Sequence, residues 1–163
     1  MYSERLLSLL PRSCHNKITV HEHFYLKSEY GLAGIHIDDF SSAVPSGYKG
    51  KISMNCSDIS KLKETKKHSN YVFLKNIFDC IEFPEQKSSF SMQELETAAQ
   101  LGLIDKKVYA MGGMTYDNIR LARDFGFGGV VICGDLWNRF DIHSQVDFKN
   151  ILNHFERLRK AVE

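Results

Sequence analysis

The sequence lacks a strong net charge, paired cysteines and long apolar runs. Its 21 Lys and Arg residues against 20 Asp and Glu residues leave a net charge of +1, so it has no electrostatic signature of a nucleic-acid-binding protein. Ser8 and Pro11 interrupt the leucine-rich N-terminus, which is too short for a signal-peptide core or a membrane span. We expect no nucleic-acid partner and no membrane.

The cysteines do not form a C-x-x-C pair, and they lie far apart in the chain, at Cys14, Cys56, Cys80 and Cys133. A chain of 163 residues does not need disulfides to complete its core. We therefore expect free thiols and a cytoplasmic location. No linker, repeat or low-complexity tract divides the chain, so we expect a single domain over residues 1–163.

Apolar runs of strand length alternate with helical patterns, which is typical of a parallel α/β sheet. The expected strands are Lys17–His21, Ala33–Ile37, Lys51–Met54, Tyr71–Leu74, Val108–Met111 and Gly129–Cys133. The expected helices are Ser3–Leu10, Tyr25–Tyr30, Ser57–Lys67, Ser91–Leu101, Tyr116–Phe125 and Val146–Val162. Ser91 and Glu94 have the spacing of a capping box at the start of one of these helices.

Six strands are two fewer than a closed (β/α)₈ barrel needs. Because a helical pattern begins almost at Met1 with no strand before it, we expect a TIM barrel that is incomplete at the N-terminus, without its first two strands. An exposed sheet edge is normally covered, so a second copy of the chain or the C-terminal helix is expected to cover the opening. An open doubly wound sheet of six strands is the alternative fold.

Two glycine turns follow the last two expected strands, at Gly112-Gly113 and at Cys133-Gly134. Turns without side chains let backbone N–H groups approach an anion closely, and a following helix adds positive potential. In parallel barrels the loops after the last two strands frequently bind phosphate. The pattern predicts a phosphate cup formed by Gly112, Gly113, Cys133 and Gly134, although the glycines could instead serve only tight packing of helix on strand.

Histidines and carboxylates gather near the ends of the first two expected strands. His21 and His23 form an H-x-H pattern, with His36 on the next strand, and such a pattern also begins the metal site of some hydrolases. Rim or core hydrogen bonding is the simpler role for them. Asp38 and Asp39 are adjacent carboxylates, for which a turn cap is the simpler role.

These segments resemble the thiamine phosphate synthase family, and in particular its Bacteroides-type branch, over nearly the whole chain. Val20-His21-Glu22 and Gly34–Ile37 match the family's Asn-Asp and G-V-H-L strands, and Tyr71–Leu74 matches its Y-V-F-L strand. Ala110–Met114 and Gly129–Gly134 match the A-L-G-G-I and G-V-A-V-V-S segments, and Gly134–Asn138 resembles the ending typical of the branch.

The resemblance implies a barrel that joins hydroxymethylpyrimidine diphosphate to thiazole phosphate and releases pyrophosphate with the help of Mg²⁺. By position, the two glycine turns would hold the thiazole phosphate. His21, Glu22 and Asn55 stand at substrate- or diphosphate-binding positions. The resemblance implies Mg²⁺ ligands at Glu22 and, close to the family's later Asp, at Asp38 and Asp39.

The chain departs from the family where the diphosphate binds. No Gln-x-Arg-x-Lys clamp precedes Lys17, and the Gly-Pro-x-Phe-x-Thr-x-Thr-Lys segment becomes Lys75–Phe83, so Phe83 stands in place of its Lys. Three functions are therefore open: a slow or inactive synthase, a catalytically silent member that binds a phosphorylated thiazole-like ligand, and a metal-dependent hydrolase that uses His21 and His23.

Overall fold

The computed structural model describes residues 2–141, 143 and 148–163. Its sheet consists of β1 (Thr19–Val20), β2 (Gly34–Ile37), β3 (Lys51–Cys56), β4 (Tyr71–Leu74), β5 (Val108–Met111) and β6 (Gly129–Val131). Every neighbouring pair is parallel, and the order in the sheet is the order in the chain. The carboxyl ends of all six strands therefore lie along one edge.

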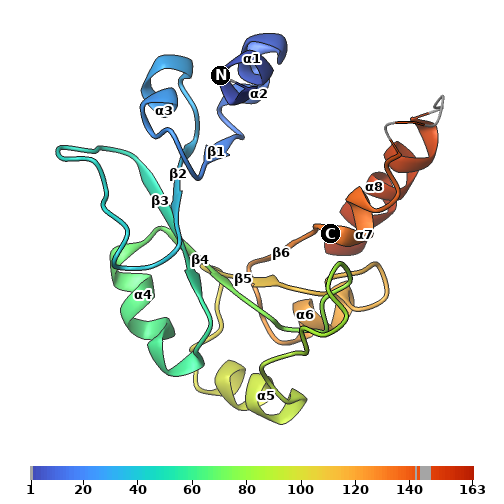
Figure 1. Cartoon of the computed structure of the whole chain (residues 1–163). Coiled ribbons are helices and arrows are strands. Elements are labelled where there is room, and N and C mark those ends of the chain that lie inside the picture. The colour runs from blue at the N-terminus through green and yellow to red at the C-terminus, as the bar shows by residue number, and fades with distance from the viewer. Residues whose placement is uncertain (1, 142, 144–147) are drawn as a thin grey trace.

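The helices are α1 (Tyr2–Leu9), α2 (Arg12–His15), α3 (Tyr25–Tyr30), the 3₁₀ turn η1 (Ile59–Lys61), α4 (Leu62–His68), α5 (Met92–Gln100), α6 (Ile119–Asp124), α7 (Gly134–Trp137) and α8 (Lys149–Val162). Figure 1 shows α3 to α6 along the outer side of a curled sheet, with α1 and α2 beyond one end and α8 beyond the other. The result is a half-barrel of six parallel strands.

The doubly wound alternative is wrong. A doubly wound sheet reverses its strand order and carries helices on both faces, whereas this order runs from β1 to β6 without reversal. The expected α/β fold with six parallel strands is confirmed. A closed barrel is not seen, because within the described residues β1 and β6 pair only with β2 and β5.

Most expected elements are present with small shifts at their ends. Three have the predicted bounds, namely Tyr25–Tyr30, Tyr71–Leu74 and Val108–Met111. β1 is shorter than expected, β6 ends at Val131, and the short helices α2 and α7 were not predicted. The last helix begins at Lys149, and its predicted start at Val146 lies outside the described residues.

Alternation along the strands gives the sheet two different faces. On β4 and β5, buried Val72, Leu74, Val108 and Ala110 belong to one core cluster with residues of the outer helices, such as Leu62 and Leu95. The intervening side chains lie on the other, concave face and are half-buried, and three of the four, Tyr71, Phe73 and Tyr109, are aromatic. Phe73 stacks on His36 with ring centres 5.0 Å apart, and Tyr71 stacks on Tyr109 at 5.4 Å.

The two ends of the sheet have different neighbours. β1 lies beside α3, and α8 packs against α6 and α7 beyond β6. Among the described residues, none of the helices combines the length and the apolar character that crossing a bilayer requires.

Candidate functional site

The two glycine turns stand side by side at the carboxyl edge of the sheet. Met111 of β5 is in register with Val131 of β6, so the residues that follow each strand emerge next to one another. A cavity of about 190 Å³ lies there, and Gly112, Gly113, Cys133 and Gly134 all line it. The structure therefore brings together the four residues that the sequence predicts to bind phosphate.

Backbone donors are available at both turns. Within the described part of the chain, the N–H groups of Gly113 and Gly134 donate no hydrogen bond. Gly134 is the first residue of α7, where N–H groups have no partner inside the helix. An anion in the cavity can satisfy such donors, and the phosphate role stays a prediction.

Gly112 and Gly113 also have a packing role. They adopt φ values of +101° and +59°, a region that side chains disfavour. A Cβ atom on Gly113 would lie 2.2 Å from the carbonyl oxygen of Asp79, and one on Gly112 would lie 2.9 Å from the Asn76 backbone. The absence of side chains at these two positions lets the loop after β4 pack against the end of β5. The packing partner of the glycines is thus this loop rather than a helix.

Glu82 from that loop also lines the cavity, and sequence analysis gave it no role. A Cβ atom on Gly134 would lie 2.7 Å from its Oε2 and 2.9 Å from its Oε1. The sequence does contain a signal, because Glu82 stands at the second Thr of the family's Gly-Pro-x-Phe-x-Thr-x-Thr-Lys segment. A carboxylate at that position changes the charge beside the cup.

A second polar group lies at the ends of β1 to β3 and includes three of the predicted substrate or metal residues. Asp38 accepts a hydrogen bond from Asn55 Nδ2 at 2.9 Å, and its other oxygen lies 3.1 Å from His21 Nε2. Burial acts to raise the pKa of Asp38, but the hydrogen bonds from Asn55 and His21 outweigh it and hold that pKa below its ordinary value.

His36 extends this group along the concave face. Its Nδ1 lies 2.9 Å from Ser53 Oγ. Burial lowers the pKa of His36, and the nearby His21 lowers it further. The Oδ1 atom of Asn55 is buried and has no hydrogen-bond partner among the described residues. This group can orient a polar ligand at the sheet edge, because the ring nitrogen of His36 that does not face Ser53 can donate or accept a hydrogen bond, depending on the tautomer.

The remaining predicted metal ligands do not join this group. The Glu22 side chain is 78% exposed, and its carboxylate lies 4.0 Å from His23 Nε2. Asp39 accepts hydrogen bonds from the Ser41 backbone and hydroxyl, which is the turn-cap role. Asp38 already has both oxygens engaged.

Among the described residues, no three His, Cys, Asp or Glu side chains converge on a point that could hold a metal ion. Glu22, Asp38 and Asp39 as they stand do not fit a Mg²⁺ site, which needs several oxygen ligands in near-octahedral geometry. The arrangement of His21 and His23 likewise gives the hydrolase alternative no support.

Known proteins match this chain in the comparison of structures but not in the two comparisons of sequence. No protein-family model matches the chain. No curated protein matches its sequence. The chain is similar to the crystal structure of thiamine phosphate pyrophosphorylase from Bacteroides thetaiotaomicron, with 40% identity, a TM-score of 0.87, and coverage of 99% of this chain and 77% of that one.

Two more distant structures share the fold alone. Thiamine phosphate pyrophosphorylase from Pyrococcus furiosus is 15% identical, with a TM-score of 0.62 and coverage of 88% of this chain and 66% of that one. A native KDPGal structure is 18% identical, with a TM-score of 0.60 and coverage of 86% and 63%.

The parallel half-barrel, with its cavity at the carboxyl ends of the last two strands, defines an α/β-barrel-type protein with a candidate small-molecule site. The identity to the Bacteroides protein extends over nearly all of this chain. The chain belongs to the thiamine phosphate pyrophosphorylase family, which is also called thiamine phosphate synthase, and to its Bacteroides-type branch.

Proposed function

We propose that this chain acts in thiamine biosynthesis by binding a thiazole phosphate in the cup formed by Gly112, Gly113, Cys133 and Gly134. The observation that carries the proposal is the pair of glycine turns on adjacent strands, which share one cavity. The backbone N–H groups of Gly113 and Gly134 donate to no described residue, which favours an anionic ligand in the cavity. Family membership supports the choice of a thiazole phosphate.

In the family reaction, the ring nitrogen of the thiazole forms a bond to the pyrimidine methylene carbon while pyrophosphate leaves. The protein contributes by positioning the two substrates and by stabilising the departing negative charge. In this chain the backbone donors would position the thiazole phosphate, and the rings on the concave face, such as Phe73 and Tyr109, offer a stacking surface for a flat heterocycle.

Charge stabilisation for the leaving pyrophosphate is poor in this chain. Phe83 stands in place of the family's Lys, and Glu82 adds a carboxylate beside it. Lys87, the nearby cation of the same loop, is 3.1 Å from Asp79 and is engaged there. Lys75 lines the cavity, but one cation leaves several phosphate oxygens without a counter-charge. We infer slow or absent turnover, with ligand binding retained.

Binding can be tested by nuclear magnetic resonance, because the glycine amides are the predicted ligands. Titration of ¹⁵N-labelled protein with thiazole phosphate is expected to shift the amide signals of Gly113 and Gly134. Gly31 and Gly102 also have positive φ but do not line this cavity, so their signals are the matched control. Equal shifts at all four glycines, or none at Gly113 and Gly134, would contradict the cup.

Turnover can be tested in a coupled assay with both phosphorylated substrates and Mg²⁺. The expected rate is at least a hundredfold below that of the Bacteroides protein assayed in parallel, because charge-assisted phosphate contacts contribute about 1.5–3 kcal/mol each. A rate in the ordinary enzymatic range of about 1–10³ s⁻¹ would contradict the inference. It would mean that other residues, such as Lys75, stabilise the leaving group.

A further inference from the structure

The proposed cup already holds a negatively charged group that belongs to the chain itself. The Glu82 carboxylate carbon lies 2.6 Å, and its two oxygens 2.7 and 2.9 Å, from the position that a Cβ atom on Gly134 would take. The carboxylate therefore lies directly against the Cα of Gly134, on the side of the turn that has no side chain. Glu82 and Gly134 both line the cavity.

Hydrogen bonds within the loop after β4 hold Glu82 in this position. Cys80 N–H donates to the Gln86 carbonyl at 2.9 Å, and Gln86 N–H donates to the Phe83 carbonyl at 2.8 Å. Cys80 Sγ lies 3.5 Å from Glu82 Oε2. These contacts close a short loop that carries Glu82 over the second glycine turn.

Few interactions hold the carboxylate group of Glu82 itself. Glu82 is an exposed residue and forms no ion pair with any Lys, Arg or His in the described part of the chain. The Cys80 thiol, which donates a hydrogen bond to Glu82 Oε2, is a weak donor. Rotation of this side chain toward solvent therefore breaks few interactions, and it would empty the cavity next to Gly134.

We propose that Glu82 is an internal anion that a phosphorylated ligand must displace from the cup, so that this residue sets which ligand charge the site accepts. The inference rests on the proposed phosphate cup. Two anions a few ångströms apart repel each other strongly in a partly enclosed site. Phosphate and the Glu82 carboxylate are therefore alternative occupants, and binding is weakened by the fraction of time that Glu82 fills the cup.

The reactivity of the Cys133 thiol gives a second, independent test of where the Glu82 carboxylate lies. Loss of surrounding water raises the pKa of Cys133, and the nearby Glu82 carboxylate raises it further. Removal of the Glu82 charge should lower the pKa of Cys133, which increases the thiolate fraction at a fixed pH and the rate of reaction with a thiol reagent.

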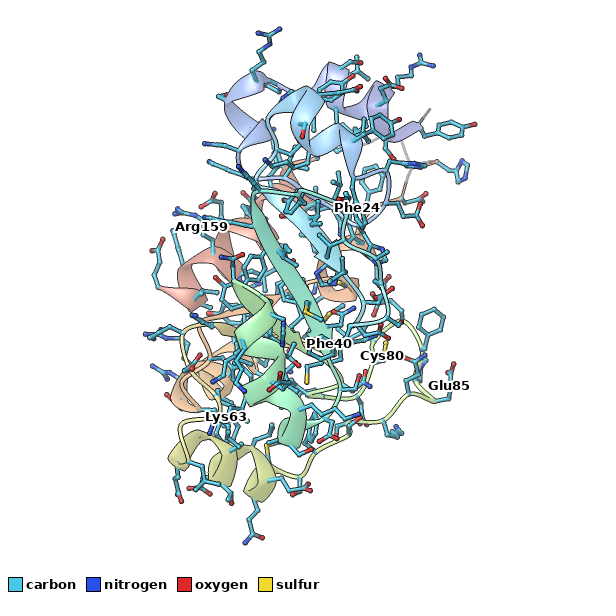
Figure 2. All side chains as sticks on the ribbon, turned by 90° about the vertical axis from the view of Figure 1, so that its left-hand side faces the viewer. Phe24, Phe40, Lys63, Cys80, Glu85 and Arg159 are labelled. Atoms are coloured by element: carbon cyan, nitrogen blue, oxygen red, sulfur yellow. The ribbon has the colours of Figure 1, made fainter. Side chains whose placement is uncertain are left out.

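The test is a calorimetric titration of inorganic phosphate into wild type, Glu82→Gln and Glu85→Gln at low ionic strength. Glu85 belongs to the same loop and carries the same charge, but it does not line the cavity, and Figure 2 shows it directed away from the body of the protein. Glu82→Gln is expected to bind phosphate about tenfold more tightly, and Glu85→Gln to change affinity less than about twofold because exposed distant charges are screened.

Cys133 reactivity is measured on the same three proteins without phosphate, with mass spectrometry to identify the modified cysteine. Faster modification of Cys133 in Glu82→Gln, but not in Glu85→Gln, is expected. Unchanged Cys133 reactivity in Glu82→Gln would overturn the placement of the carboxylate, and equal phosphate affinity in wild type and Glu82→Gln would overturn the displacement. Failure of every variant to bind phosphate or thiazole phosphate would instead overturn the proposed cup, and the inference with it.

Discussion

Two separate features require glycine at position 113, namely its backbone conformation and the close packing around it. Its φ of +59° and the 2.2 Å approach of the Asp79 carbonyl oxygen to a Cβ position both exclude a side chain. Gly102 has a similar φ of +68° with nothing within 4 Å of its Cβ position. The two positions therefore separate the cost of the backbone conformation from the cost of the contact.

Gly113→Ala is expected to lower the free energy of unfolding by about 2–4 kcal/mol, since a steric contact of about 1–3 kcal/mol adds to a conformational cost of about 1 kcal/mol. Gly102→Ala is the matched control and should show only the conformational part. Chemical denaturation of both variants measures the difference. Equal losses would mean that the loop after β4 moves away at no cost.

Sequence patterns predicted the residues whose role depends on local backbone geometry. The glycine turns and the Ser91–Glu94 capping box belong to this class, and the capping box is confirmed. The position of Glu82 against Gly134 and the contacts of Asp38 were not predicted, because these partners lie elsewhere in the chain. Asp38 meets Asn55, 17 residues away, only through the parallel register of β2 and β3.

At the scale of an element, α7 is a four-residue helix that is fixed by side chains. Asp135 Oδ2 lies 2.8 Å from His154 Nε2 of α8, and Oδ1 lies 3.1 Å from Arg139. Burial acts to raise the pKa of Asp135, but its hydrogen bonds with His154 and Arg139 outweigh it, so the pKa is held below its ordinary value. This contact ties the end of the cup to the C-terminal helix.

Asp135→Asn is expected to lower the free energy of unfolding by about 1–3 kcal/mol near neutral pH. Because the folded-state pKa is depressed, the stabilisation is present above the unfolded-state pKa of about 3.9 and is lost as the pH falls through the lower folded-state value. The difference from wild type should therefore shrink in acid. Asp124→Asn, on the exposed end of α6, is the control, and an equal pH dependence in both variants would contradict the role of Asp135.

Helices and strands were predicted where the segment is long enough for its apolar residues to show a regular repeat. α2 and α7 have four residues each, about one helical turn, so no apolar repeat can reveal them. β6 ends before Cys133 because that residue has left the extended conformation, with ψ at −95°. Such ends are decided by tertiary contacts rather than by the local sequence.

At the scale of the whole molecule, β6 borders an apolar groove of about 530 Å³. It is lined mainly by Val130, Ile132, Leu136, Trp137, Phe155, Leu158 and Val162. Trp137 is 61% exposed and Phe155 is 48% exposed. Among the described residues β6 pairs only with β5, and an apolar surface beside such a sheet edge is a typical association site. A second copy of the chain was one of the two covers expected for the opening, the C-terminal helix being the other.

Sedimentation velocity is expected to show self-association that decreases on dilution, and Phe155→Glu should shift the protein toward the monomer. Leu101→Glu is the matched control, because Leu101 is 70% exposed at the end of α5 and does not line the groove. A wild-type protein that stays monomeric at high concentration, or two variants that behave alike, would contradict the predicted interface.

The parallel arrangement of the strands was within reach of the sequence, because alternating strands and helices lead to parallel neighbours. The choice between a barrel-type curl and a doubly wound sheet was not, since it depends on which face of the sheet each helix covers. The resemblance to the family supplied that choice, and the strand order confirms it.

The consecutive order of β1 to β6 also governs how the polypeptide folds. Among the residues that the structure describes, each strand pairs only with its neighbours along the chain. The sheet can therefore grow one strand and helix at a time, without waiting for a distant segment to be synthesised. Growth of this kind leaves the end units least protected. In native-state hydrogen exchange, amides of the two-residue β1 should exchange first and those of β3 to β5 last.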